Sequence, residues 1–225
     1  MAEEFRTIQT PPAADPAALG LAAFALTTFL LSAANAHLMD SASGDAWLGY
    51  AFAYGGLGQV LAGMWEFRNR NVFGATAFST YGGFWLALGI FITFLVLSKS
   101  WAGAITANPN DVPNALAWFL FAFAIFNLYM LLWSTRVSGA VFAVFLTLQV
   151  TEILLVIGFF MEAHGHANSG WIHWGGWVGI LTAACAWYAS AAGVCNGMAG
   201  RVVVPVGAAL WKDRPGSPMP SRSDA

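Results

Sequence analysis

Long apolar stretches alternate with short polar breaks along the chain. Six of these stretches carry few or no charged residues, and each approaches the roughly 20 residues that a membrane-spanning helix requires. The pattern therefore predicts an all-α membrane protein with six transmembrane helices. The predicted spans cover approximately residues 16–36, 46–65, 74–97, 115–133, 138–161 and 171–197.

The composition of the chain supports the same fold class. Hydrophobic residues make up 58% of the chain and charged residues only 9%, whereas a soluble domain carries about 25% charged residues. So few charges cannot cover a surface that faces water. The first residues lack the positively charged start and apolar core of a removable signal peptide, and we expect none here.

Basic residues are distributed unequally between the two sides of the predicted bundle. Eight of the nine lie in the N-terminal tail, the second and fourth loops or the C-terminal tail, and Lys99 lies on the other side. Because loops rich in Lys and Arg stay in the cytoplasm, we predict that both termini are cytoplasmic. The expected organisation is a cytoplasmic tail at 1–15, a six-helix transport domain at 16–204, and a cytoplasmic Pro- and Ser-rich tail at 205–225 that is disordered toward its end.

The third predicted span begins with several hydroxyl side chains. On a helix, Thr76, Ser79 and Thr80 share one face with Gly83, because they follow i, i+3, i+4, i+7 spacing. Two interpretations are open: the stripe lines a path for a small solute, or its hydroxyls bond back to carbonyls of the preceding turn. Small residues on the second and sixth spans leave a similar choice between close helix packing and room for a pore.

Four segments carry a resemblance to a known family. The most specific runs from Tyr54 to Leu86, YGGLGQVLAGMWEFRNRNVFGATAFSTYGGFWL. Another, DPAALGLAAFALTT from Asp15 to Thr28, is similar to the motif Asn-Pro-Ala-Pro-Leu-Gly-Leu. FNLYMLLWSTR in the fourth span and WIHWGGWVGI at the start of the sixth also match, so the resemblance covers nearly the whole chain. Together these segments resemble the acetate uptake transporter family, which includes bacterial succinate–acetate permeases and fungal ammonia/acetate exporters.

This resemblance implies a channel or transporter for acetate and other small monocarboxylates, with succinate as a further substrate. It also implies a homo-oligomer, a ring-shaped hexamer in the bacterial inner membrane with a pore within each protomer. The family's hydrophobic constriction combines a Phe, a Tyr and a Leu, which match Phe24, Tyr81 and Leu148 here. Three positions depart from the family pattern: Asp15 replaces an Asn, Ala18 replaces the second Pro of the same motif, and Glu152 stands where relatives carry an apolar residue.

A carboxylate that enters hydrocarbon must lose its water, at an idealised cost of order 20 kcal/mol. No Lys or Arg is predicted at mid-membrane, so neutral hydrogen-bond donors must stabilise the solute. A protonated acid would pass the constriction with much less desolvation, which leaves a passive anion channel and proton-linked symport as the two mechanisms. The candidate pore-lining side chains are Thr27, Thr28, Gln59, Thr76, Ser79 and Thr80.

Glu152 lies in the middle of the fifth predicted span. Ionisable residues inside a membrane are costly and are usually functional. Glu152 is therefore a candidate for a proton-linked role. The alternative is a neutral side chain that bonds to Gln149 or Thr151.

Other classes of function lack their characteristic residues in this sequence. A membrane enzyme would need a grouped nucleophile, base and orienting residue, and we expect no enzymatic activity, no cofactor, no metal and no nucleic-acid partner. Glu162, His164 and His166 are residue types that bind zinc, but without fixed spacing they are read first as a solvated loop. Two alternatives to carboxylate transport stay open: a channel for ammonia or another small neutral solute, and a non-transporting sensor or scaffold.

Overall fold

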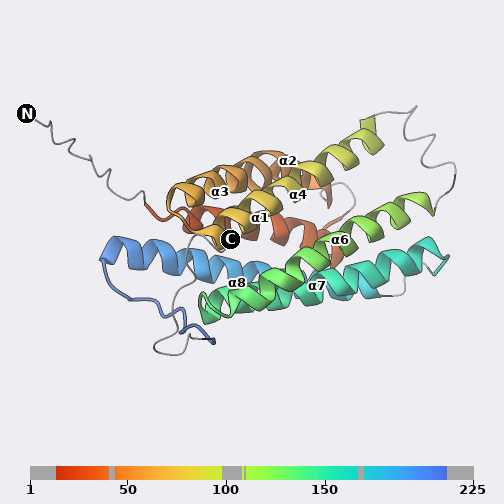
Figure 1. Cartoon of the computed structure of the whole chain (residues 1–225). Helices are drawn as coiled ribbons and strands as arrows, with labels where there is room; N and C mark the ends of the chain where they lie inside the picture. Colours follow the sequence, from red (N-terminus) through yellow and green to blue (C-terminus); the bar gives the residue numbers. More distant parts are fainter. Residues whose placement is uncertain (1–13, 41–43, 98–107, 109, 167–169, 212–225) are drawn as a thin grey trace, which may run out of the picture.

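The computed structural model describes residues 14–40, 44–97, 108, 110–166 and 170–211. These residues form an elongated bundle of helices (Figure 1), and the described ranges contain no strand. The predicted all-α class is confirmed. The helices are α1 Ala17–Asn35, α2 Trp47–Phe52, α3 Gln59–Arg68, α4 Val72–Leu97, α6 Asp111–Ser134, α7 Gly139–Ala163 and α8 Trp171–Ala199, with a 3₁₀ turn η1 at Gly44–Ala46 and a π-helical turn η2 at Ala53–Gly58.

Five helices, α1, α4, α6, α7 and α8, are long and apolar enough to cross a membrane. The remaining predicted span corresponds to α2, η2 and α3, which follow one another without a break from Trp47 to Arg68. The chain is therefore an integral, multi-pass membrane protein. Its second span differs from a regular α-helix, because the π-turn η2 lies between α2 and α3.

Glycines allow the closest approaches between helices. A Cβ atom on Gly55 of the π-turn would lie 2.6 Å from Thr27 Oγ1 of α1, and one on Gly179 of α8 would collide with Ser32 of α1. Both distances are shorter than any real side chain allows, so α1 packs directly against the backbones of η2 and α8. These small residues serve helix packing rather than pore space.

The end of the described chain packs against the turn between α6 and α7. The backbone N–H groups of Leu210 and Trp211 donate to the Thr135 carbonyl at 2.8 and 3.0 Å. The Trp211 ring stacks on Trp133 with 6.2 Å between centroids, and the Arg136 guanidinium lies 5.4 Å from the Trp211 ring centre. Residues 205–211 therefore hold a defined position, while the disorder predicted toward the chain end falls on residues 212–225, which lie outside the described ranges.

Candidate functional site

Two cavities lie inside the helix bundle, one on each side of Tyr81. The larger has a volume of about 220 Å³ and is walled mainly by α1, α4, α6 and α7; we call it the Trp47 cavity. The smaller has a volume of about 80 Å³ and is walled by α1, α3, α4 and α7; we call it the Glu66 cavity. Both have predominantly apolar walls, and within the described residues neither is lined by Lys, Arg or His.

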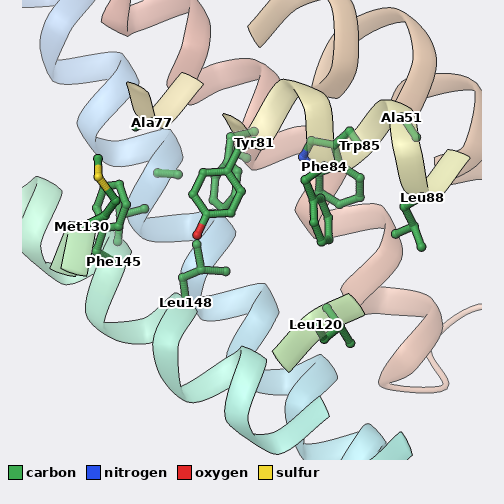
Figure 2. Packing of buried hydrophobic residues seen from close by; sticks show 14 of the residues in the cluster. Ala51, Ala77, Tyr81, Phe84, Trp85, Leu88, Leu120, Met130, Phe145 and Leu148 are labelled. Carbon is green, nitrogen blue, oxygen red and sulfur yellow. The ribbon is translucent and has the colours of Figure 1, made fainter. Parts of the chain in front are cut away.

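Three residues line both cavities in the described part of the chain: Phe24, Tyr81 and Leu148. They come from α1, α4 and α7, and each is less than 9% exposed. The rings of Phe24 and Tyr81 meet edge to face, with 5.7 Å between centroids. Figure 2 shows the Tyr81 hydroxyl pointing toward Leu148. The structure thus places these three side chains together, between the two cavities.

Aromatic rings and a polar network fix the position of Tyr81. Its ring packs edge to face against Phe126 at 5.4 Å, and its hydroxyl donates to Asn127 Oδ1 at 2.9 Å. Asn127 Nδ2 donates to the Phe145 carbonyl at 3.0 Å and to Gln149 Oε1 at 2.9 Å. Asn127 is 0% exposed. A fully buried amide from α6 therefore ties α4 to α7 at the level of Tyr81.

Glu152 lies one turn beyond Leu148 on α7, is 3% exposed, and lines the Trp47 cavity. Its Oε1 lies 3.4 Å from the Tyr81 hydroxyl, and Oε2 is buried without a hydrogen-bond partner among the described residues. Gln149 and Thr151 bond to other groups, so the neighbour of Glu152 is Tyr81 rather than either of them.

Two further predicted side chains line a cavity. Thr28 lines the Trp47 cavity and Gln59 lines the Glu66 cavity. Thr28 Oγ1 and Gln59 Oε1 are both buried, and neither has a hydrogen-bond partner within the described ranges. Thr27 differs: it lines neither cavity, and its hydroxyl donates to the Ala23 carbonyl of the preceding turn at 2.9 Å.

The hydroxyl stripe of α4 lies away from both cavities. Thr76, Ser79 and Thr80 are absent from both linings as far as the described residues show. Ser79 lies against Gly63 of α3, where an added Cβ would overlap its hydroxyl. The opposite face of α4, which carries Tyr81, faces the cavities. The three residues do share a face, as predicted, but that face lines neither cavity in the described part of the chain, and its Ser79 packs against α3.

Sequence reasoning missed several polar residues of the cavities, Glu66 and Trp85 among them. Glu66 lies just beyond the second predicted span, which ends near residue 65, yet it is 1% exposed and lines the Glu66 cavity. Trp85 lines the Trp47 cavity, and its indole N–H is buried without a partner in the described part of the chain. The i, i+4, i+8 spacing of Ala77, Tyr81 and Trp85 on the apolar face of α4 is the signal that could have identified this face.

The polar cluster at the end of α7 does not form a metal centre. Glu162 and His166 line a third cavity together with His37 and His173, while His164 Nδ1 lies 2.7 Å from the Phe160 carbonyl. Among the described residues, no group of three His, Cys, Asp or Glu side chains is placed to hold a metal ion.

Asp15, where the family pattern has an Asn, acts at the start of α1. Its Oδ1 accepts the Ala17 N–H at 2.9 Å, so it satisfies a backbone donor that the first helical turn leaves open.

Comparison with known proteins places this architecture among relatives. A family model described as GPR1/FUN34/yaaH matches residues 1–209. The chain is 38% identical to "Acetate permease A" of Emericella nidulans over 92% of its own length and 70% of that protein. It is 35% identical to "Succinate-acetate/proton symporter SatP" of Escherichia coli over 86% of its length and 95% of that protein. A solved structure, "Structure of the bacterial acetate channel SatP", superposes with a TM-score of 0.76 at 33% identity, covering 87% of this chain and 99% of that one. The chain belongs to the GPR1/FUN34/yaaH family.

Proposed function

We propose that this chain carries acetate and related small carboxylates, succinate among them, across the membrane through a path inside each protomer. One observation supports this most directly: two cavities approach each other from opposite ends of the bundle and share only Phe24, Tyr81 and Leu148 within the described residues. These three side chains form a short apolar constriction on the proposed path. The relatives named for acetate and succinate transport support the choice of substrate.

The chemistry of the walls favours passage of the protonated acid. A carboxylate without a counter-ion is costly in an apolar site, and the described residues supply no cation to either cavity. An uncharged acid needs only hydrogen-bond partners, which Thr28 and Gln59 offer on the two sides of the constriction. We therefore favour proton-linked transport over passive conduction of the anion.

The proposal includes a location and an assembly. With eight of nine basic residues on one side, both termini would be cytoplasmic and the membrane would be the plasma membrane, the inner membrane of a bacterium. A homo-oligomer, a hexamer by family resemblance, would cover part of the apolar surface of α6, where Trp118, Ile125 and Leu132 are each more than half exposed. Crosslinking of the purified protein in detergent would give the number of protomers.

Flux into liposomes tests the function. Purified protein in proteoliposomes should take up labelled acetate faster than empty liposomes, and the uptake should acidify the lumen. Excess succinate should compete with acetate, whereas ammonium should not. Competition by ammonium alone would indicate the small neutral solute channel instead. An acetate uptake rate equal to that of empty liposomes would instead indicate a non-transporting sensor or scaffold.

A further inference from the structure

Glu152 stands out because hydrogen bonds orient the side chains around Tyr81, its nearest hydrogen-bonding neighbour. Gln149 Nε2 donates to the Ala124 carbonyl at 3.3 Å, which orients that amide and turns its Oε1 toward Asn127 Nδ2. Asn127 is oriented in turn, since Nδ2 also faces the Phe145 carbonyl. Asn127 Oδ1 therefore faces Tyr81 and can only accept a hydrogen bond.

The Tyr81 hydroxyl has a single proton, and the geometry directs it to Asn127 Oδ1 at 2.9 Å. Glu152 Oε1 lies 3.4 Å from the same hydroxyl, which is long for an O–H···O bond. The lone pairs of an ionised Glu152 carboxylate would face the lone pairs of the Tyr81 hydroxyl oxygen, with no proton between them. With its proton on Asn127, the Tyr81 hydroxyl offers Glu152 no donor, and Glu152 Oε2 has no partner in the described part of the chain, so an ionised Glu152 would lack the hydrogen-bond donors that a buried carboxylate requires.

The electrostatic surroundings of Glu152 agree with a neutral state. α1, α2, α4 and α6 present no charged side chain to the Trp47 cavity, and Tyr81 is the one other titratable group that lines it within the described residues. From α8, the neighbouring contact is the Thr182 hydroxyl, 3.2 Å from the hydroxyl of Thr151. An ionised Glu152 would therefore be a buried charge without compensation.

The second oxygen of Glu152 belongs to a group of polar atoms on one cavity. Glu152 Oε2, Thr28 Oγ1 and Trp85 Nε1 are buried, lack partners in the described part of the chain, and belong to residues that line the Trp47 cavity. The indole N–H donates only, and the threonine hydroxyl donates or accepts. A carboxylate matches this set, because its two oxygens accept hydrogen bonds and one of them can also accept a proton.

We propose that Glu152 is the proton donor of the path: its carboxyl group gives a proton to the carboxylate of a small monocarboxylic acid in the Trp47 cavity. The O–H bond of Glu152 breaks, an O–H bond forms on the substrate, and the uncharged acid passes Phe24, Tyr81 and Leu148. The Glu152 carboxylate regains its proton from a hydronium ion of the solution on the side from which the substrate entered, which leaves water. One proton accompanies each carboxylate, and this inference rests on the proposed function.

The same arrangement sets a preference among substrates. A dicarboxylate that receives one proton from Glu152 keeps a second negative charge, and no cation lines the cavity among the described residues to offset it. Acetate should therefore be carried faster than succinate when both are ionised in solution. Lowering the pH should reduce the difference between the two transport rates.

The test compares Glu152→Gln with Glu152→Asp in proteoliposomes. Glutamine keeps the shape and can still donate a hydrogen bond to Tyr81, but it cannot release a proton, whereas aspartate can. At neutral to alkaline pH, we expect Glu152→Gln to carry acetate at least tenfold more slowly than the unmodified protein. Its remaining flux should fall about tenfold per pH unit, following the free acid, and Glu152→Asp should keep the shallower pH dependence of the unmodified protein. Glu162→Gln, near the end of the same helix, is the matched control and should behave as the unmodified protein.

Several outcomes would overturn the proposal without touching the proposed function. One is a Glu152→Gln variant with unchanged flux and pH dependence, and another is an equal loss in the Gln and Asp variants. The infrared difference spectrum between unmodified protein and Glu152→Gln gives a readout that is independent of transport. It should contain the carbonyl band of a protonated carboxyl group that shifts in D₂O, and its absence would also refute the proposal. A lack of flux in the unmodified protein would instead contradict the proposed function itself.

Discussion

The bond between Tyr81 and Asn127 gives the sharpest test of how the constriction is held. Tyr81→Phe removes one hydroxyl and leaves the ring that packs against Phe24 and Phe126. Asn127 Oδ1, which is 0% exposed and accepts that hydroxyl at 2.9 Å, would lose its donor. Hydrogen bonds between membrane helices contribute about 0.6 kcal/mol on average and up to about 1.7, while a buried acceptor left without a donor costs about 1–3 kcal/mol. We therefore expect Tyr81→Phe to destabilise the fold by about 1–2 kcal/mol.

A double-mutant cycle separates this bond from general damage. Asn127→Leu removes the acceptor and also leaves the Phe145 carbonyl and Gln149 Oε1 without this donor, so it should cost about 2 kcal/mol or more. The double variant lacks the Asn127 amide oxygen, so the loss of the Tyr81 hydroxyl no longer leaves a buried acceptor without a donor. The combined cost should then fall short of the sum by about 1 kcal/mol.

Reversible unfolding in mixed detergent and SDS micelles measures these free energies. Tyr129→Phe on α6 is the matched control, since its side chain is 46% exposed, and it should stay within about 0.5 kcal/mol of the unmodified protein. Additive costs in the cycle, or a Tyr81→Phe variant as stable as the unmodified protein, would show that the bond does not hold the constriction in place.

Three further predictions follow from the packing and the cavities. Gly56→Ala should cost about 2 kcal/mol or more in the same unfolding assay, because a Cβ there would overlap the Ala51 carbonyl of α2 and the Leu86 side chain of α4. Gly83→Ala, whose added Cβ meets no described heavy atom within 4 Å, should stay within about 0.5 kcal/mol. Thr28→Val should slow acetate uptake into proteoliposomes severalfold, because Thr28 lines the Trp47 cavity. Thr76→Val should take up acetate at the rate of the unmodified protein. Equal uptake rates for the two variants would contradict the assignment of the path. Trp211→Ala should lower stability by about 1 kcal/mol through loss of its stacking and its contact with a guanidinium, and an unchanged unfolding midpoint would argue against a structural role for the tail.

Hydropathy was sufficient to predict the helical spans, because lipid imposes length and apolarity on every segment that crosses it. It could not predict the π-turn at Ala53–Gly58, whose glycines pack closely against Thr27 of α1 and Leu86 of α4, because such contacts between spans are not visible in hydropathy. The burial of Glu66 could not be predicted from the sequence for a related reason. Its position beside two arginines suggested a polar loop, while in the structure it lies close to Gly74 of α4.

The sequence also could not predict which face of each span turns toward lipid, a neighbouring helix or a cavity. In a soluble helix, the polar face marks the solvent side, but a membrane helix can turn either face toward lipid, a neighbour or a cavity. Thr76, Ser79 and Thr80 were correctly placed on one face, yet none of them lines either cavity within the described residues, and Ser79 packs against α3. Phe24, Tyr81 and Leu148 were assigned by resemblance to the family motifs, and the structure brings them together at one point; their role as the constriction stays a proposal.

The packing of the C-terminal segment has a consequence for how the protein must be handled in the laboratory. The N–H groups of Val203 and Val204 donate to Asn196 Oδ1 at 2.7 and 2.9 Å, and the segment then reaches the Thr135 carbonyl of the α6–α7 turn. Since Leu210 and Trp211 are synthesised more than 70 residues after Thr135, the α6–α7 hairpin gains this support only after α8 and the segment that follows it have left the ribosome. A reporter protein fused at a residue before 211 would therefore report on a chain whose helices have inserted into the membrane. In that chain, the α6–α7 turn would still lack its contact with the C-terminal segment.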